Sequence, residues 1–162
     1  MNTLSGRRPA DLMAQKLALG VPALLLGGAY LAQYGFGLYP CEMCWWQRYP
    51  HFGALGLAGL SFVAPPRNLW VALAGLSIFV SGMIGGFHAG VEYGWWEGLT
   101  ACSTTVEVSG DPLAAIMNAP LIRCDSAPWD LFGISLAGWN FLISCGAGIA
   151  ICVLLRRGAK TT

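Results

Sequence analysis

The sequence predicts an all-α integral membrane protein, a bundle of four transmembrane helices with two loops on the outer side of the membrane. Asp, Glu, Lys and Arg make up only 10% of the 162 residues, against roughly 25% in soluble proteins. Hydrophobic residues account for 56%, the formal net charge is +1, and the charged residues leave four long uncharged stretches. This composition excludes a disordered chain, a polybasic nucleic-acid binder and an ordinary soluble enzyme.

The uncharged stretches place the four predicted helices. An ionised side chain at the centre of a bilayer costs a few kcal/mol, so charges are usually excluded from spans. A helix needs about 20 mainly apolar residues to cross the hydrocarbon, and each stretch is long enough for one crossing. We therefore expect a single membrane domain over residues 1–162, with spans at about 17–34, 49–65, 69–89 and 131–155 and outer loops at about 35–48 and 90–130.

Basic residues orient the predicted bundle, because Lys and Arg near the ends of spans stay in the cytoplasm. Most of them lie before the first span, between the second and third, or after the fourth: Arg7, Arg8, Lys16, Arg67, Arg156, Arg157 and Lys160. Both termini are therefore expected in the cytoplasm. The two outer loops then face the periplasm of a bacterial inner membrane.

The second outer loop contains one predicted short helix. Asp111 followed by Pro112 is typical of a helix start, and the segment 113–119 has one apolar face. We expect this helix to lie parallel to the membrane surface. Packing against the ends of the bundle is the alternative.

The six cysteines fall into two groups. Cys145 and Cys152 lie inside the fourth span, where a protonated thiol is unreactive, and we interpret them as small buried residues. The other four lie in the outer loops, where an oxidising compartment lets disulfides form and persist. These four are Cys41, Cys44, Cys102 and Cys124.

The first outer loop carries a C-x-x-C motif, Cys41-Glu42-Met43-Cys44. This spacing lets two thiols close a small, easily opened ring, and it lowers the pKa of the nucleophile. Half of a zinc site is the alternative interpretation. Zinc usually needs a second close pair of ligands, whereas Cys102 and Cys124 are far apart in the sequence. We therefore expect a redox pair and no metal.

Arg48 follows Cys44 by four residues at the mouth of the second span. Its guanidinium favours a Cys44 thiolate and any anion that develops nearby. An interfacial arginine that reaches the lipid headgroups is the alternative. Pro50 is allowed in the first turn of a helix and not deeper, which places the expected helix start near Gln47.

His88 lies near the outer end of the third span, four residues before Glu92. Two interpretations remain open. It is either a histidine at the water interface that is hydrogen-bonded to Glu92, or a donor to an oxygen of a lipid-soluble ring bound at the membrane edge. His51, one residue after Pro50, is interpreted as structural.

Taken together, these motifs resemble the disulfide bond formation protein B family. The resemblance is carried by Tyr39-Pro40-Cys41-Glu42-Met43-Cys44 with Gln47-Arg48, by Gly85 and His88, by Trp96 through Cys102, by Cys124, and by Trp129-Asp130-Leu131-Phe132-Gly133. It implies a quinone-dependent thiol oxidase of the bacterial inner membrane. Such a protein reoxidises a periplasmic DsbA-like thiol oxidase and passes the electrons to ubiquinone or menaquinone.

The resemblance also implies roles for the four outer cysteines. Cys102 would form the mixed disulfide with the partner, and Cys124 would be its mate in a Cys102–Cys124 disulfide. Cys41 and Cys44 would form the disulfide next to the quinone. Of that pair, Cys44 would be the thiolate that meets the ring.

The same resemblance places three polar residues in a quinone site. Arg48 would support the quinone and the thiolate, and His88 would line the pocket. Gln47, beside Arg48 in the motif, is assigned to the same site.

Two other functions are compatible with the sequence. A relative of vitamin K epoxide reductase also couples paired loop cysteines to a quinone-like ring on four helices, but its active C-x-x-C lies late in the chain, whereas the pair here follows the first span. The second alternative is a non-catalytic membrane protein with structural or metal-binding cysteines.

Overall fold

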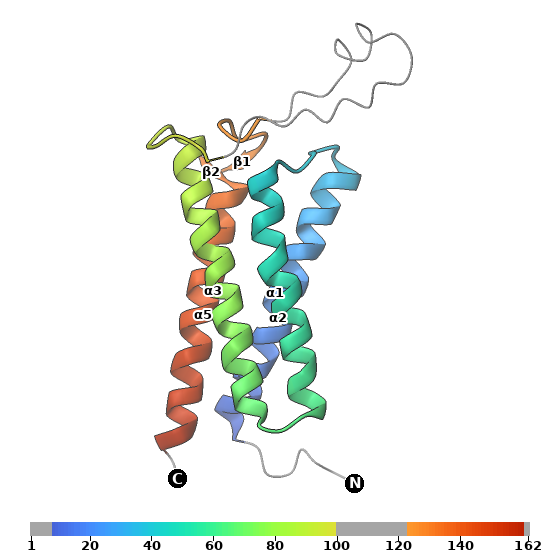
Figure 1. Cartoon of the computed structure of the whole chain (residues 1–162), viewed down its shortest axis with the longest axis vertical. Coiled ribbons are helices and arrows are strands. Elements are labelled where there is room, and N and C mark those ends of the chain that lie inside the picture. The colour runs from blue at the N-terminus through green and yellow to red at the C-terminus, as the bar shows by residue number, and fades with distance from the viewer. Residues whose placement is uncertain (1–7, 100–122, 161–162) are drawn as a thin grey trace, which may run out of the picture.

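The computed structural model describes residues 8–99 and 123–160, which fold mainly into long helices packed side by side (Figure 1). The helices are α1 (Pro9–Gly35), α2 (Glu42–Val63), α3 (Arg67–Glu92) and α5 (Leu136–Lys160). A short antiparallel hairpin of β1 (Asp130–Leu131) and β2 (Ile134–Ser135) precedes α5. Figure 1 places this hairpin at the same end of the bundle as the start of α2 and the end of α3. Three distant parts of the sequence therefore meet at that end.

Three helices of the described chain are long and apolar enough to cross a membrane: α1, α3 and residues 136–158 of α5. The expectation of a mainly helical membrane protein is thereby confirmed. α2 is 22 residues long, but its first half carries Gln47, Arg48 and His51, which lower its mean hydropathy. A fourth crossing by α2 stays a prediction.

The second helix begins earlier than expected. The predicted start near Gln47 is wrong, because α2 begins at Glu42 and continues through Pro50. The reason lies in the cap: the sulfur of Cys41 accepts a hydrogen bond from the Cys44 N–H at 3.3 Å. A side chain that accepts from the first free N–H groups stabilises a helix start. The C-x-x-C motif is therefore the beginning of α2 rather than part of a loop ahead of it.

The start of the last helix also differs from the expected span. Residues 131–135 form most of the hairpin instead of helix. Phe132 and Gly133 at its turn have φ angles of 55° and 76°, in the left-handed region that a right-handed helix does not contain. The Gly133 N–H donates to the carboxylate of Asp130 at 3.1 Å, which holds the turn. The short helix expected over 113–119 lies outside the described residues.

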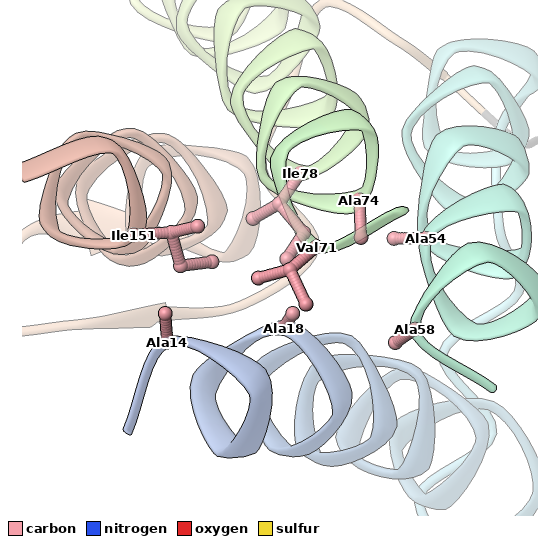
Figure 2. Packing of buried hydrophobic residues seen from close by; sticks show 8 residues of the cluster. All are labelled: Ala14, Ala18, Ala54, Ala58, Val71, Ala74, Ile78 and Ile151. Carbon is pink, nitrogen blue, oxygen red and sulfur yellow. The ribbon is translucent and has the colours of Figure 1, made fainter. Parts of the chain in front are cut away.

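The centre of the bundle is packed with apolar side chains from all four helices, and five of the eight are alanines from α1, α2 and α3 (Figure 2). Small residues let helix backbones approach closely, which is how helices associate in a membrane. A Cβ placed on Gly82 of α3 would lie 2.7 Å from the sulfur of Cys145 on α5, so Cys145 occupies a packing position. The central cluster consists of Ala14, Ala18, Ala54, Ala58, Val71, Ala74, Ile78 and Ile151.

Candidate functional site

The two thiols of the C-x-x-C motif touch each other at the end of the bundle. Cys41 is the cap of α2 and Cys44 lies in its first turn, so their spacing is set by the helix start. Their sulfurs are 2.9 Å apart and share a hydrogen bond. Cys41 is buried, whereas Cys44 is half-buried and lines a cavity. Cys44 is therefore the sulfur that a ligand in this cavity would meet.

This hydrogen bond separates the pKa values of the two thiols. It raises the pKa of Cys41 to about 12, and burial adds to the effect. Cys44 lies before the apolar part of α2. The same hydrogen bond lowers its pKa, although burial and the nearby Glu92 carboxylate oppose this shift. Because the thiolate is the nucleophilic form, this difference favours Cys44 over Cys41 as the nucleophile.

His88 of α3 is buried against Cys41. Its Nε2 lies 3.6 Å from the Cys41 sulfur and 3.8 Å from Oε1 of Glu92. Its Nδ1 lies 2.8 Å from the amide nitrogen of Gln47, which also donates to the Met43 carbonyl at 3.2 Å. His88 thus shows features of both open interpretations, since it lies near Glu92 and also contacts Cys41 and lines the cavity. Its role in a quinone site stays a prediction.

A polar network continues from Gln47 into the bundle. Asn140 of α5 donates to Oε1 of Gln47 at 2.9 Å and to the hydroxyl of Ser81 at 3.2 Å. Its Oδ1 accepts from Nε2 of His51 at 3.0 Å and from the Ser144 hydroxyl at 2.8 Å. Sequence reasoning missed Asn140. An amide in an uncharged span is the signal that could have found it, because buried polar groups in membranes need partners.

Arg48 lies one helical turn after Cys44, so the two residues share a face of α2. Arg48 is 6% exposed, and its guanidinium donates to Oε1 of Gln33 at 2.7 Å and to the Ala29 carbonyl at 3.3 Å. It also stacks over the rings of Tyr30 and Trp45, with distances of 5.0 and 4.9 Å to the ring centroids. The structure thus holds this cation inside the bundle, between α1 and α2.

A cavity of about 260 Å³ joins these groups. Its walls are mostly apolar and come from α1, from the segment before α2 and from the start of α5. Large apolar walls with a few convergent polar groups are typical of small-molecule sites. The polar and ionisable side chains that line it include Cys44, Gln47, Arg48, His51, His88 and Glu92.

The second pair of predicted redox cysteines is described in part. Cys124 is buried and packs in one cluster with Cys41, Met43 and Val91. This places a residue from the second loop next to the C-x-x-C motif. Cys102 lies outside the described residues.

Three possible metal ligands meet at the same end of the bundle. Cys41, Cys44 and His88 offer three donor atoms that lie within 4.8 Å of one another. A structural zinc site takes four ligands, and no fourth joins this group among the residues that the structure describes. The absence of a metal stays a prediction.

Comparisons with known proteins cover nearly the whole chain. The family model for disulfide bond formation protein DsbB matches residues 13–154, which include both cysteine-bearing segments. Disulfide bond formation protein B of Verminephrobacter eiseniae (strain EF01-2) is 31% identical over 95% of this chain and 90% of its own. The protein of the same name from Polaromonas sp. (strain JS666 / ATCC BAA-500) is 30% identical over 89% of each chain. No solved structure matches the chain.

Proposed function

The chain belongs to the disulfide bond formation protein B family, and from that premise we propose the route by which it moves electrons from protein thiols to a membrane quinone. It is a disulfide-forming oxidoreductase of the bacterial inner membrane. In the proposed route, electrons enter at Cys102 and Cys124, pass to Cys41 and Cys44, and leave to a quinone in the cavity. The observation that carries this route is that Cys44 lines the same cavity as Arg48 and His88.

The first half of the route is thiol–disulfide exchange in the periplasm. A thiolate of a reduced DsbA-like oxidase attacks the Cys102–Cys124 disulfide at Cys102, and Cys124 leaves as the free thiolate. The second thiol of the partner then releases Cys102, so the partner gains a disulfide and the loop pair gains two electrons. The burial of Cys124 beside Cys41 supports the next exchange, since attack of one sulfur on another needs contact.

The second half of the route takes place at the cavity. The residues fit a quinone, because apolar walls suit a flat ring and the polar groups are positioned for its oxygens. A bound quinone, either ubiquinone or menaquinone, supplies a two-electron, two-proton acceptor. Cys44 provides the thiolate that faces the cavity, and Cys41 forms the disulfide with it as the pair is oxidised. Arg48 stabilises negative charge at this low-dielectric site.

The proposal includes the orientation of the chain. α2 makes the fourth crossing, both termini lie in the cytoplasm, and all four redox cysteines face the periplasm. In support, the start of α1 and the end of α5 lie at the end of the bundle opposite the hairpin (Figure 1). The distribution of Lys and Arg assigns the end that carries the two termini to the cytoplasm.

The test is quinone reduction by the purified protein in detergent or nanodiscs, driven by a reduced DsbA-like thiol oxidase. We expect quinol to form together with one partner disulfide per turnover. A Cys41→Ser and Cys44→Ser double variant should leave quinone oxidised while retaining exchange at the outer pair. Quinol formation at the wild-type rate in that variant would contradict the route.

A further inference from the structure

The proposed route leaves a buried acid at the cavity without a role. Glu92 is the last residue of α3, and its side chain is only 4% exposed. Its Oε2 is buried and has no hydrogen-bond partner within the described part of the chain. The residue lines the same cavity as Cys44 and Arg48. A buried carboxylate oxygen without a partner is costly, so its retention beside reactive groups points to a chemical function.

The neighbouring His88, when neutral, carries its proton on Nε2 and can only donate a hydrogen bond from that atom. An amide nitrogen can only donate, so the contact between Gln47 Nε2 and His88 Nδ1 makes Nδ1 the acceptor. The proton of a neutral His88 is then on Nε2, which faces Cys41 and Glu92. Neutral His88 therefore has no free lone pair with which to accept a thiol proton.

The other ionisable groups of the cavity are no better placed. Arg48 is permanently charged and carries donors only. His51 has an Nδ1 without a partner in the described residues, but it follows Cys44 by seven residues of α2, about 10 Å along the helix axis. Tyr39 is 60% exposed. Glu92 remains as the acceptor near the thiols.

We propose that Glu92 is the catalytic base and acid of this site, which takes the proton of Cys44 and passes it to an oxygen of the quinone ring. This inference rests on the proposed function. Oxidation of Cys41 and Cys44 breaks two S–H bonds, forms one S–S bond and releases two electrons and two protons. Both electrons and both protons end on the quinone as quinol. Glu92 carries the protons one at a time, first that of Cys44 and then that of Cys41, and is a carboxylate again after each transfer.

Two measurements on Glu92→Gln should change in opposite directions: alkylation of Cys44 should become faster, and oxidation of the thiols by quinone should become slower. This combination distinguishes a base from a residue that acts only through its charge. The first uses reduced, quinone-free protein and follows alkylation of Cys44 by mass spectrometry across pH. The Glu92 charge opposes ionisation of Cys44, so its removal should increase the thiolate fraction. We expect Cys44 of Glu92→Gln to be alkylated faster than in wild type at neutral pH.

The second measurement is a single turnover of the same reduced protein with a short-chain ubiquinone analogue. General acid–base groups contribute roughly 10²- to 10⁴-fold to rate, so we expect Glu92→Gln to oxidise its thiols at least about 10²-fold more slowly. Glu92→Asp, which keeps a carboxylate, should recover part of this loss. Glu97→Gln changes an exposed acid five residues away and should behave as wild type.

The pH dependence gives a further readout. Without a base, the thiol must lose its proton to solvent, so the rate of Glu92→Gln should rise more steeply with pH than that of wild type. Wild type should also show a solvent deuterium isotope effect on quinol formation, which needs no variant. The titratable and charged groups around Glu92 are Tyr39, Cys41, Cys44, Arg48, His51 and His88.

The outcomes are distinguishable. Faster alkylation together with slower thiol oxidation supports a base. Thiol oxidation in Glu92→Gln that is as fast as in wild type, or the absence of a solvent isotope effect in wild type, would overturn the inference while leaving quinone reduction intact. If wild type itself forms no quinol, the proposed function fails first, and the inference fails with it.

Discussion

Asn140 of α5 donates its amide hydrogen to Oε1 of Gln47 of α2 at 2.9 Å. This contact ties the helix that carries the C-x-x-C motif to the helix that follows the second outer loop. Because the amide of Gln47 is oriented by Asn140, its nitrogen is directed at Nδ1 of His88. The position of a histidine beside Cys41 thus depends on a residue of another helix, α5.

Replacement of Asn140 tests this dependence. Asn140→Leu should lower the free energy of unfolding by about 1–3 kcal/mol, since Gln47, His51 and Ser144 each lose a buried hydrogen-bond partner. Denaturation of the detergent-solubilised protein measures the loss. Asn68→Leu, at an exposed position near the start of α3, is the matched control. Equal stability of Asn140→Leu and wild type would contradict the network.

Local patterns were enough to predict which side chains of the C-x-x-C segment lie together, but not the residues from other helices that surround them. Cys41, Cys44 and Arg48 sit within one short motif, so their proximity follows from spacing alone. His88 required the topology, and the structure brings it to Cys41 as a pocket residue. Asn140 and Glu92 were missed as members of the site, because their partners are set by how α3 and α5 pack against α2. The helix start was misplaced because the Cys41 cap outweighs the Pro50 signal.

Removal of the Arg48 guanidinium should act on one half-reaction. Arg48→Ala should slow quinone reduction by roughly 10²- to 10³-fold, the usual cost of losing a group that stabilises developing charge. Thiol exchange at Cys102 should be largely retained, since the guanidinium contacts α1 and Trp45 of α2. Stopped-flow quinol formation and partner oxidation measure the two steps separately.

Two comparisons control the Arg48 result. Arg48→Lys keeps the charge but loses the planar donor pair that binds Gln33 and Ala29, so an intermediate rate is expected. Arg156→Ala changes an exposed cation at the far end of α5 and should leave both steps unchanged. Equal loss in both half-reactions of Arg48→Ala would refute the assignment.

The pairing of Cys102 with Cys124 predicts a trapped complex. In Cys124→Ala, Cys102 has no mate, and its thiolate can attack the disulfide of an oxidised DsbA-like partner, which frees the partner's second thiol. Because Cys124 is absent and cannot displace the partner, the mixed disulfide at Cys102 should accumulate above its wild-type level. Non-reducing electrophoresis and peptide mass spectrometry detect it. Cys152→Ala is the control and should trap nothing, because Cys152 lies in the second half of α5 and is exposed, not buried as the sequence predicted. Absence of the complex, or its attachment at another cysteine, would reverse or remove the two roles.

The separated pKa values of the C-x-x-C pair predict how the stability of the reduced protein changes with pH. The pKa of Cys44 is lower in the folded protein than its ordinary value of 9.0. As the pH rises from the lowered pKa to 9.0, the free energy of unfolding should therefore increase. The pKa of Cys41 is raised to about 12, so its contribution is intact below 9.0 and is lost as the pH rises from 9.0 towards 12. The free energy of unfolding should therefore pass through a maximum near pH 9.

Denaturation of the reduced protein at a series of pH values checks this maximum. Cys41→Ser should abolish the decline above pH 9 and weaken the rise below it, because the Cys41 sulfur provides the hydrogen bond that lowers the pKa of Cys44. Cys152→Ser, which alters a thiol in α5 remote from the motif, should retain the wild-type profile. A reduced wild-type protein whose stability falls steadily from neutral pH would show that the two sulfurs do not share this hydrogen bond in solution.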